Sequence, residues 1–157
     1  EELSSNHQAD AAEDMRDSLL QKAVDNAAIS GYPKALYREQ EKLLEEDYQS
    51  YADMFGCTLD EVYQMFELDE QARRQECENA TYQVMVLDLI QKAEGIALSD
   101  EEFDDMLAEF AEYNEYGSVE ELLEEYDSDS LKEYFLREMT LDFLEENAEV
   151  NIVEEEA

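Results

Sequence analysis

The sequence feature that most constrains the fold is a repeated signal that ends one helix and starts the next. Glycine readily takes the left-handed conformation that ends a helix, and the chain has only four, at Gly31, Gly56, Gly95 and Gly117. Three of them precede a capping box, in which a Ser or Thr and a Glu three residues later satisfy free N–H groups at a helix start. The boxes pair Thr58 with Glu61, Ser99 with Glu102 and Ser118 with Glu121, and Ser130 with Glu133 forms a fourth. The chain is therefore predicted to be a series of helices.

These signals predict helices over residues 10–28, 33–55, 58–67, 69–94, 99–114, 118–126 and 129–148. Apolar side chains recur in them at intervals of three and four, as at Leu131, Phe135 and Met139, so each helix has an apolar face. The only proline, Pro33, is expected in the first turn of the second helix, where its missing N–H does no harm. We expect an all-α fold, an elongated multi-helix domain with almost no strand.

The net charge of the chain limits the kinds of partner that it can bind. Against 45 Asp and Glu stand 10 Lys and Arg, a formal net charge of −35, so nucleic acid and anionic membrane surfaces would be repelled. Hydrophobic residues still make up 44% of the chain, which is too many for a disordered acidic tail. No apolar run reaches the roughly 18 to 20 residues that cross a bilayer, and no signal peptide opens the sequence. We expect a folded, soluble, cytoplasmic protein.

The residues offer little chemistry for an enzyme or a metal site. His7 is the only histidine and Cys57 and Cys77 are the only cysteines, so neither a nucleophilic triad nor a zinc site has its usual partners. The segment 127–134 begins like a calcium loop but has Leu131 and Lys132 where that loop needs Asp or Asn and Gly. We expect no catalytic, cofactor-binding or metal-binding residues and a reduced, intracellular pair of thiols.

Methionine and aromatic side chains are the remaining candidates for function. Between positions 51 and 70, five of them flank a predicted helix turn: Met54, Phe55, Tyr63, Met65 and Phe66. They either close the turn between two helices or form a binding surface, because methionine suits surfaces that adapt to varied partners. In the apolar run 84–93, Met85 and Leu89 lie on a second apolar face of the helix. That face is either core or binding surface.

The order of three segments resembles the C-terminal domain of bacterial trigger factor, a ribosome-associated chaperone. The segments span residues 19–44, 69–107 and 131–150, and the resemblance covers about residues 15 to 152. It rests on a proline that opens a helix at Pro33, on the turn motif from Leu89 to Glu102, and on the closing motif from Leu141 to Val150.

The resemblance implies an ATP-independent holdase whose helical body and arms form a cradle for unfolded or nascent polypeptides. Family members also have a ribosome-docking domain and a peptidyl-prolyl isomerase domain, and neither is represented here, so we expect no enzyme activity and no direct ribosome contact. We expect residues 1–14 to lead into the first helix, 15–152 to form the chaperone domain and 153–157 to be a frayed acidic tail. The client-binding candidates are Met54, Phe55, Tyr63, Met65, Phe66, Met85, Leu89, Tyr113 and Tyr116.

Two expectations about partners follow. The acidic field should favour basic clients, and the open cradle makes weak self-association a further expectation. The alternative is an acidic interaction module or nucleic-acid mimic that blocks a basic site on a partner. A mimic would need ordered carboxylates at phosphate-like spacing and few exposed aromatic side chains.

Overall fold

The computed structural model describes the backbone of residues 2–148 and the side chains of residues 12–148. Within these residues the chain is helical and has no strand, which confirms the all-α class. The helices are α1 (Glu2–Asn26), α2 (Lys34–Phe55), α3 (Leu59–Met65), α4 (Glu70–Glu94), α5 (Asp100–Tyr113), α6 (Val119–Glu125) and α7 (Ser128–Glu146). Each predicted boundary lies within two residues of the observed one, except that α1 begins at Glu2 rather than near residue 10. The predicted tail, 153–157, lies outside the described residues.

Capping boxes start two helices as predicted. The Ser99 hydroxyl accepts from the Glu102 N–H at 3.3 Å, and the Glu102 carboxylate accepts from the Ser99 N–H at 2.9 Å. Thr58 and Glu61 make the same pair of bonds before α3. The Thr58 N–H and hydroxyl donate to the Glu61 carboxylate, and the Ser99 hydroxyl and N–H donate to the Glu102 carboxylate. These bonds stabilise the ionised carboxylates, so the pKa values of Glu61 and Glu102 lie below the ordinary range.

The other two predicted boxes differ from the prediction. Ser118 accepts from the Glu121 N–H at 3.2 Å, but the Glu121 carboxylate accepts from Gly117 rather than from Ser118. The box predicted at Ser130 is wrong, because Asp127 caps α7. Its carboxylate accepts from the N–H groups of both Asp129 and Ser130 at 3.1 Å. A carboxylate that satisfies two free donors takes the capping position from the hydroxyl that follows it.

Only two of the four glycines take the left-handed conformation. Gly56, after α2, has φ 66°, and Gly95, after α4, has φ 71°. Gly31 and Gly117 do not, so the prediction was wrong there. The left-handed positions that follow α3 and α5 are occupied by Glu67 (φ 56°) and Glu115 (φ 61°). Pro33 lies one residue before α2, as its N-cap, rather than in its first turn.

The chain divides into two compact units, each described here by itself. The first comprises Glu1–Lys22 and Leu87–Ala157, and we call it the leucine unit. The second comprises Ala23–Val86, and we call it the tyrosine unit, since six of the ten tyrosines belong to it.

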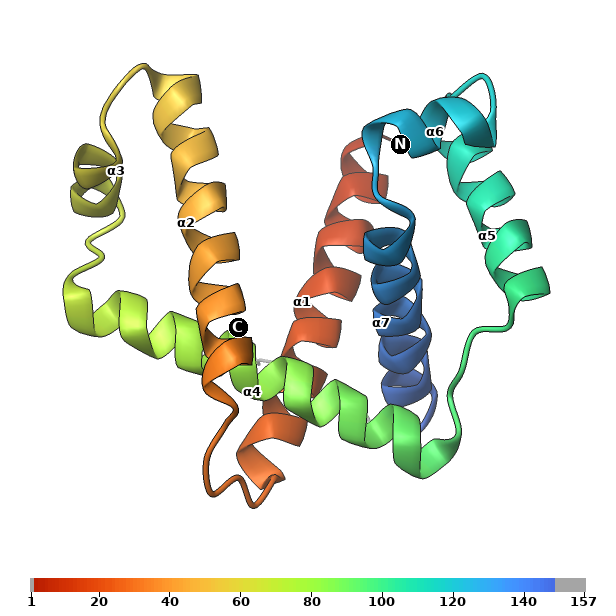
Figure 1. Ribbon diagram of the computed structural model, residues 1–157, viewed down its shortest axis with the longest axis horizontal. Helices are drawn as coiled ribbons and strands as arrows, with labels where there is room; N and C mark the ends of the chain where they lie inside the picture. The colour runs from red at the N-terminus through yellow and green to blue at the C-terminus, as the bar shows by residue number, and fades with distance from the viewer. Residues whose placement is uncertain (1, 149–157) are drawn as a thin grey trace. The chain divides into compact units, whose positions relative to one another are not determined.

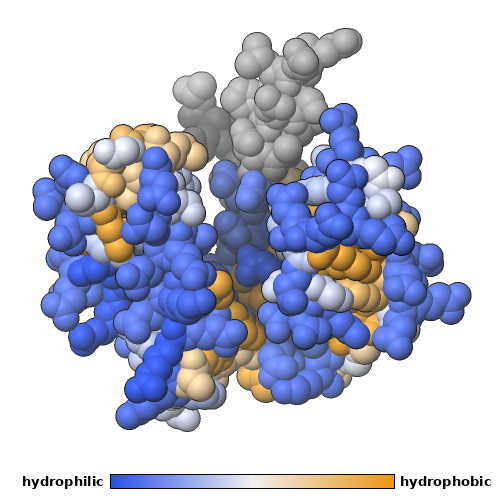
Figure 2. All heavy atoms as spheres, turned by 45° about the horizontal axis from the view of Figure 1, so that its top comes forward, coloured by the Kyte–Doolittle hydropathy of each residue, from blue (hydrophilic) through white to orange (hydrophobic). Residues whose placement is uncertain are grey.

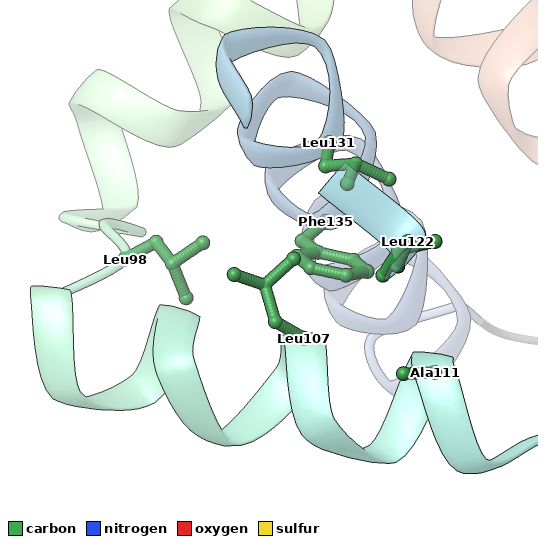
Figure 3. Close-up of a cluster of buried hydrophobic side chains, with 6 residues drawn as sticks. All are labelled: Leu98, Leu107, Ala111, Leu122, Leu131 and Phe135. Carbon is green, nitrogen blue, oxygen red and sulfur yellow. The ribbon is translucent and has the colours of Figure 1, made fainter. Parts of the chain in front are cut away.

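The leucine unit has an apolar core formed by α5, α6, α7 and the segment that leads into α5 (Figure 1). Figure 3 shows its buried side chains converging: Leu98, Leu107, Ala111, Leu122, Leu131 and Phe135. The rings of Phe103 and Phe110 meet Phe135 edge to face at 5.9 and 5.7 Å. A smaller cluster joins Leu20 of α1 with Leu87 and Leu141. Arg16 extends this contact, since it donates to Glu138 and Glu145 on α7 at 3.0 and 3.1 Å and also to Asp142.

The tyrosine unit is built around a hairpin of α2 and α3, which pack against each other (Figure 1). After α2 the Cys57 N–H donates to the Ala52 carbonyl at 3.0 Å, which closes the turn at Gly56. The buried apolar side chains of this unit are small: Val24, Ala52, Val62, Cys77 and Val86. Its large aromatic side chains therefore remain at least partly exposed.

Candidate functional site

The largest group of exposed apolar side chains lies at the end of the α2–α3 hairpin, and we call it the hairpin-end surface. Its members are between 43% and 73% exposed: Tyr51, Met54, Phe55, Met65 and Phe66. Figure 2 shows pale orange atoms gathered at this end of the tyrosine unit, surrounded by hydrophilic ones. Met54 and Phe55 come from the last turn of α2, and Met65 and Phe66 from the end of α3. Four of the five were sequence candidates, and the fold brings them together.

An array of stacked and tilted rings supports this surface. Tyr51 stacks on Phe55 with the ring centroids 6.3 Å apart, and it meets Phe66 at 5.6 Å. Tyr48 lies behind them and contacts the rings of Phe66 and Tyr63 at 5.9 and 5.5 Å. Aromatic side chains have few rotamers, so such an array presents apolar area at a low entropic cost on binding.

Tyr48 ties this array to α4. Its hydroxyl donates to the Glu76 carboxylate at 3.2 Å. Burial, followed by the charge of Glu76, raises the pKa of Tyr48 to about 12, so the hydroxyl remains a donor throughout the physiological range. Tyr48 and Tyr51 were not chosen as site residues from the sequence, although their spacing with Phe55 on one helix face is the signal that could have found them.

The fifth hairpin candidate, Tyr63, is half-buried and does not belong to the exposed set. Its ring contacts Tyr48 on one side and the Arg73 guanidinium on another, with the Arg73 Cζ 4.3 Å from the ring centroid. This cation–π contact links α3 to the first part of α4.

The candidates on α4 have different surroundings. The Leu89 side chain is 58% exposed, whereas Met85 is half-buried and the intervening Val86 and Leu87 are buried. Leu89 is therefore surface rather than core. Met85 belongs to the tyrosine unit and Leu89 to the leucine unit, so the two candidates lie in different units.

The two candidates after α5 also differ from each other. Tyr113 is 88% exposed. Tyr116 is half-buried, packs against the core of the leucine unit and donates its hydroxyl hydrogen to Glu125 at 2.8 Å. That hydrogen bond, together with burial, raises the pKa of Tyr116. Contacts within the leucine unit therefore cover part of the Tyr116 side chain, and Tyr113 is the more accessible of the two.

The described residues offer little else for chemistry. Among them, no group of three or more His, Cys, Asp or Glu side chains could hold a metal ion. None of the helices that the structure describes is long and apolar enough to cross a membrane. Cys57 and Cys77 are free thiols, and burial is the main cause that raises the pKa of Cys77. The His7 side chain lies outside the described residues.

The fold and this surface define a class of protein: an acidic all-α module with an exposed aromatic and methionine surface. The family model described as the C-terminus of bacterial trigger factor protein (TF) matches residues 1–153. The chain therefore belongs to the trigger factor C-terminal family, as the resemblance in its motifs predicted.

Curated relatives with the name trigger factor agree with this assignment. A protein of Anoxybacillus flavithermus is 32% identical over 96% of this chain and 36% of its own length. A Geobacillus protein is 33% identical over 96% of this chain and 35% of its own length, and one from Caldicellulosiruptor bescii is 30% identical over 89% and 33%. The chain spans about a third of the length of these relatives. No solved structure matches it.

Proposed function

We propose that this chain is the polypeptide-binding part of a chaperone and holds unfolded or nascent segments without ATP. The observation that carries the proposal is the hairpin-end surface, where five large apolar side chains are exposed together. A soluble acidic chain has no structural need for such a patch. Membership of the trigger factor family supports the proposal. It involves no catalytic step or cofactor, and it puts the activity in the cytoplasm, where nascent chains emerge.

The surface suits weak and reversible binding. Covering about 200 Å² of apolar area would contribute roughly 5 kcal/mol at about 25 cal/mol per Å². Most of that gain offsets the lost freedom of the two chains, so the net affinity of one patch is low. Leu89 and Tyr113 are further exposed side chains that would add small contributions of the same kind. We propose that affinity is spread over such patches rather than concentrated in one residue.

Carboxylates around the surface give the binding its electrostatic character. Asp53 precedes Met54 on α2, and Glu67 follows Phe66 after α3. These groups keep an exposed apolar patch soluble and attract clients with Lys or Arg beside their apolar residues. Basic clients should therefore bind faster than neutral ones, although neutral clients also bind.

The test is suppression of aggregation of a refolding, non-basic client. The variant Met54→Ser/Phe55→Ser removes two side chains from the hairpin-end surface, and its control, Leu43→Ser/Leu123→Ser, removes two exposed leucines elsewhere. We expect the first variant to need several-fold more protein for the same suppression and the control to match the wild type, with circular dichroism confirming that both are folded. Equal activity of the two variants would overturn the assignment of the surface.

Phe66→Ser alone should weaken suppression only a few-fold, and complete loss in a folded protein would contradict distributed binding.

The same assay tests the alternative of an acidic mimic, which the net charge of −35 favours. A mimic would act only on basic partners. Activity confined to basic clients, and unchanged in Met54→Ser/Phe55→Ser, would favour the mimic over the chaperone.

A further inference from the structure

The tyrosine unit contains a groove that is distinct from the hairpin-end surface. It has a volume of about 1020 Å³, and its walls are α2, α3 and the first part of α4. The lining includes Tyr37 and Leu44 of α2, Tyr63 of α3 and Cys77 of α4. A groove of this size, lined by apolar and aromatic side chains together with several charged ones, is large enough for a short peptide segment.

The polar group that singles out this groove is Arg73. Its guanidinium is held over the Tyr63 ring, with Cζ 4.3 Å from the ring centroid. Its Nε is buried and has no hydrogen-bond partner in the described part of the chain. A buried donor without an acceptor carries a desolvation cost of about 1–3 kcal/mol, which an incoming acceptor removes. Within the described residues Arg73 forms no ion pair, although the chain has 45 Asp and Glu residues.

The other charges of the lining limit what that partner can be. Arg74 already pairs with Glu70 at 3.6 Å, and Glu78 already accepts from the Tyr32 hydroxyl at 3.1 Å. Lys34 is the third cation of the lining. Three further carboxylates line the groove: Glu41, Glu45 and Asp60. One incoming carboxylate can therefore be received by Arg73, whereas a run of carboxylates would be repelled by the rim.

We propose that this groove binds an extended polypeptide segment in which a single Asp or Glu lies beside a large apolar side chain. The Arg73 guanidinium donates charge-assisted hydrogen bonds to the carboxylate, and the apolar side chain packs on Tyr37, Leu44 and Tyr63. The groove thus accepts segments that the acidic surroundings of the hairpin-end surface disfavour. The inference extends the proposed polypeptide binding, but it depends on a different set of residues.

Fluorescence anisotropy with three labelled heptapeptides tests the proposal. They share the sequence Gly-Ser-Phe-X-Phe-Ser-Gly with capped ends, and X is Glu, Gln or Lys. Measurements at physiological ionic strength, where the Debye length is about 8 Å, screen the distant carboxylates. We expect the Glu peptide to bind the wild type about five-fold or more tightly than the Gln peptide, since a charge-assisted pair replaces a neutral one. A fourth peptide with three consecutive Glu residues should bind more weakly than the single-Glu peptide.

The matched variants are Arg73→Gln and Arg38→Gln. Arg38 is exposed on α2 and does not line the groove, so its loss changes net charge equally without touching the site. Arg73→Gln should abolish the preference for Glu over Gln, and Arg38→Gln should keep it. Equal affinities for the Glu and Gln peptides in the wild type, or a preference that survives Arg73→Gln, would overturn the proposal. If Arg73→Gln fails to fold, Arg73→Lys is used instead. An unchanged preference for the Glu peptide over the Gln peptide in that variant counts against hydrogen bonding by the planar Arg73 guanidinium.

The outcome separates this inference from the proposed function. Met54→Ser/Phe55→Ser should keep the preference for the Glu peptide while needing several-fold more protein for the same aggregation suppression. Loss of the preference in Arg73→Gln with normal suppression confirms the groove alone. Normal suppression together with no peptide preference in the wild type rejects the groove alone and leaves the hairpin-end surface intact.

Discussion

The two compact units use their apolar side chains differently. The leucine unit buries large ones, so that Leu122 is fully buried and Phe135 is 3% exposed. The tyrosine unit buries small ones, such as Ala52 and Val62, and exposes aromatic rings at the end of its hairpin. Burial of large side chains dominates stability. The comparison indicates that the leucine unit has the more stabilising core, and the exposed rings of the tyrosine unit fit the binding role that we propose for it.

The net charge also differs between the two units. The leucine unit carries 31 acidic and 5 basic side chains, net −26, and the tyrosine unit carries 14 and 5, net −9. The unit with the larger core therefore also bears the stronger self-repulsion, and part of its burial energy offsets that repulsion.

The largest expected effect tests the difference between the cores. Phe135→Ala should lower the free energy of unfolding of the leucine unit by about 3–5 kcal/mol, because the ring leaves a cavity among Leu98, Leu107 and Leu122. Val62→Ala should cost the tyrosine unit only about 2 kcal/mol, since it removes two methyl groups. Urea unfolding followed by circular dichroism measures both. A greater loss for Val62→Ala would reverse the comparison.

The response of stability to added salt should differ between the two units because their net charges differ. Raising NaCl from 20 to 200 mM shortens the Debye length and relieves repulsion within each unit. We expect a gain on the order of 1 kcal/mol in the leucine unit, equivalent to roughly 4–8 °C in its melting temperature, and a smaller gain in the tyrosine unit. Amide hydrogen exchange of α5–α7 and of α2–α3 reports the units separately. A flat or falling stability of α5–α7 with added salt would contradict the charge argument.

The smallest expected effect should be the same in both units. Glu67 and Glu115 take left-handed φ values of 56° and 61°, where a side chain is strained and glycine is not. Glu67→Gly in the tyrosine unit and Glu115→Gly in the leucine unit should each stabilise the protein by about 0.5–1 kcal/mol, measured by thermal unfolding. Each change also removes one negative charge, so Glu120→Gln, on exposed α6, serves as the charge control. Destabilisation by either glycine would show that the glutamate makes a contact that outweighs the strain.

Local signals predicted the helices well because their causes are local. A capping box joins residues three apart, and the boxes at Thr58 and Ser99 form as predicted. The errors were also local: Asp127 displaced Ser130 as a cap, and Glu115 took the left-handed position after α5 that was expected of Gly117. In both cases two nearby residues could have taken the same backbone position, and the sequence did not show which of them would take it.

The site was predictable in part. The sequence grouped Met54, Phe55, Met65 and Phe66 because they flank one turn, and they come together because the short α3 packs back against α2. It did not reveal that Tyr63 is half-buried beneath Arg73 or that Tyr116 packs on the core. Those contacts depend on α4 and on α6, whose positions the apolar periodicity of one helix does not specify.

The sequence by itself determined the class of fold, the helix boundaries apart from the start of α1, the acidity and the family resemblance, since each follows from neighbouring residues or from composition. Only the tertiary structure decided which apolar faces are buried. Arg16 reaches Glu145 across 129 positions of the chain, and Leu89 is exposed although its neighbour Leu87 is buried. Burial is a property of residues distant in sequence, so it was the folded chain that separated the core of the leucine unit from the exposed rings of the tyrosine unit.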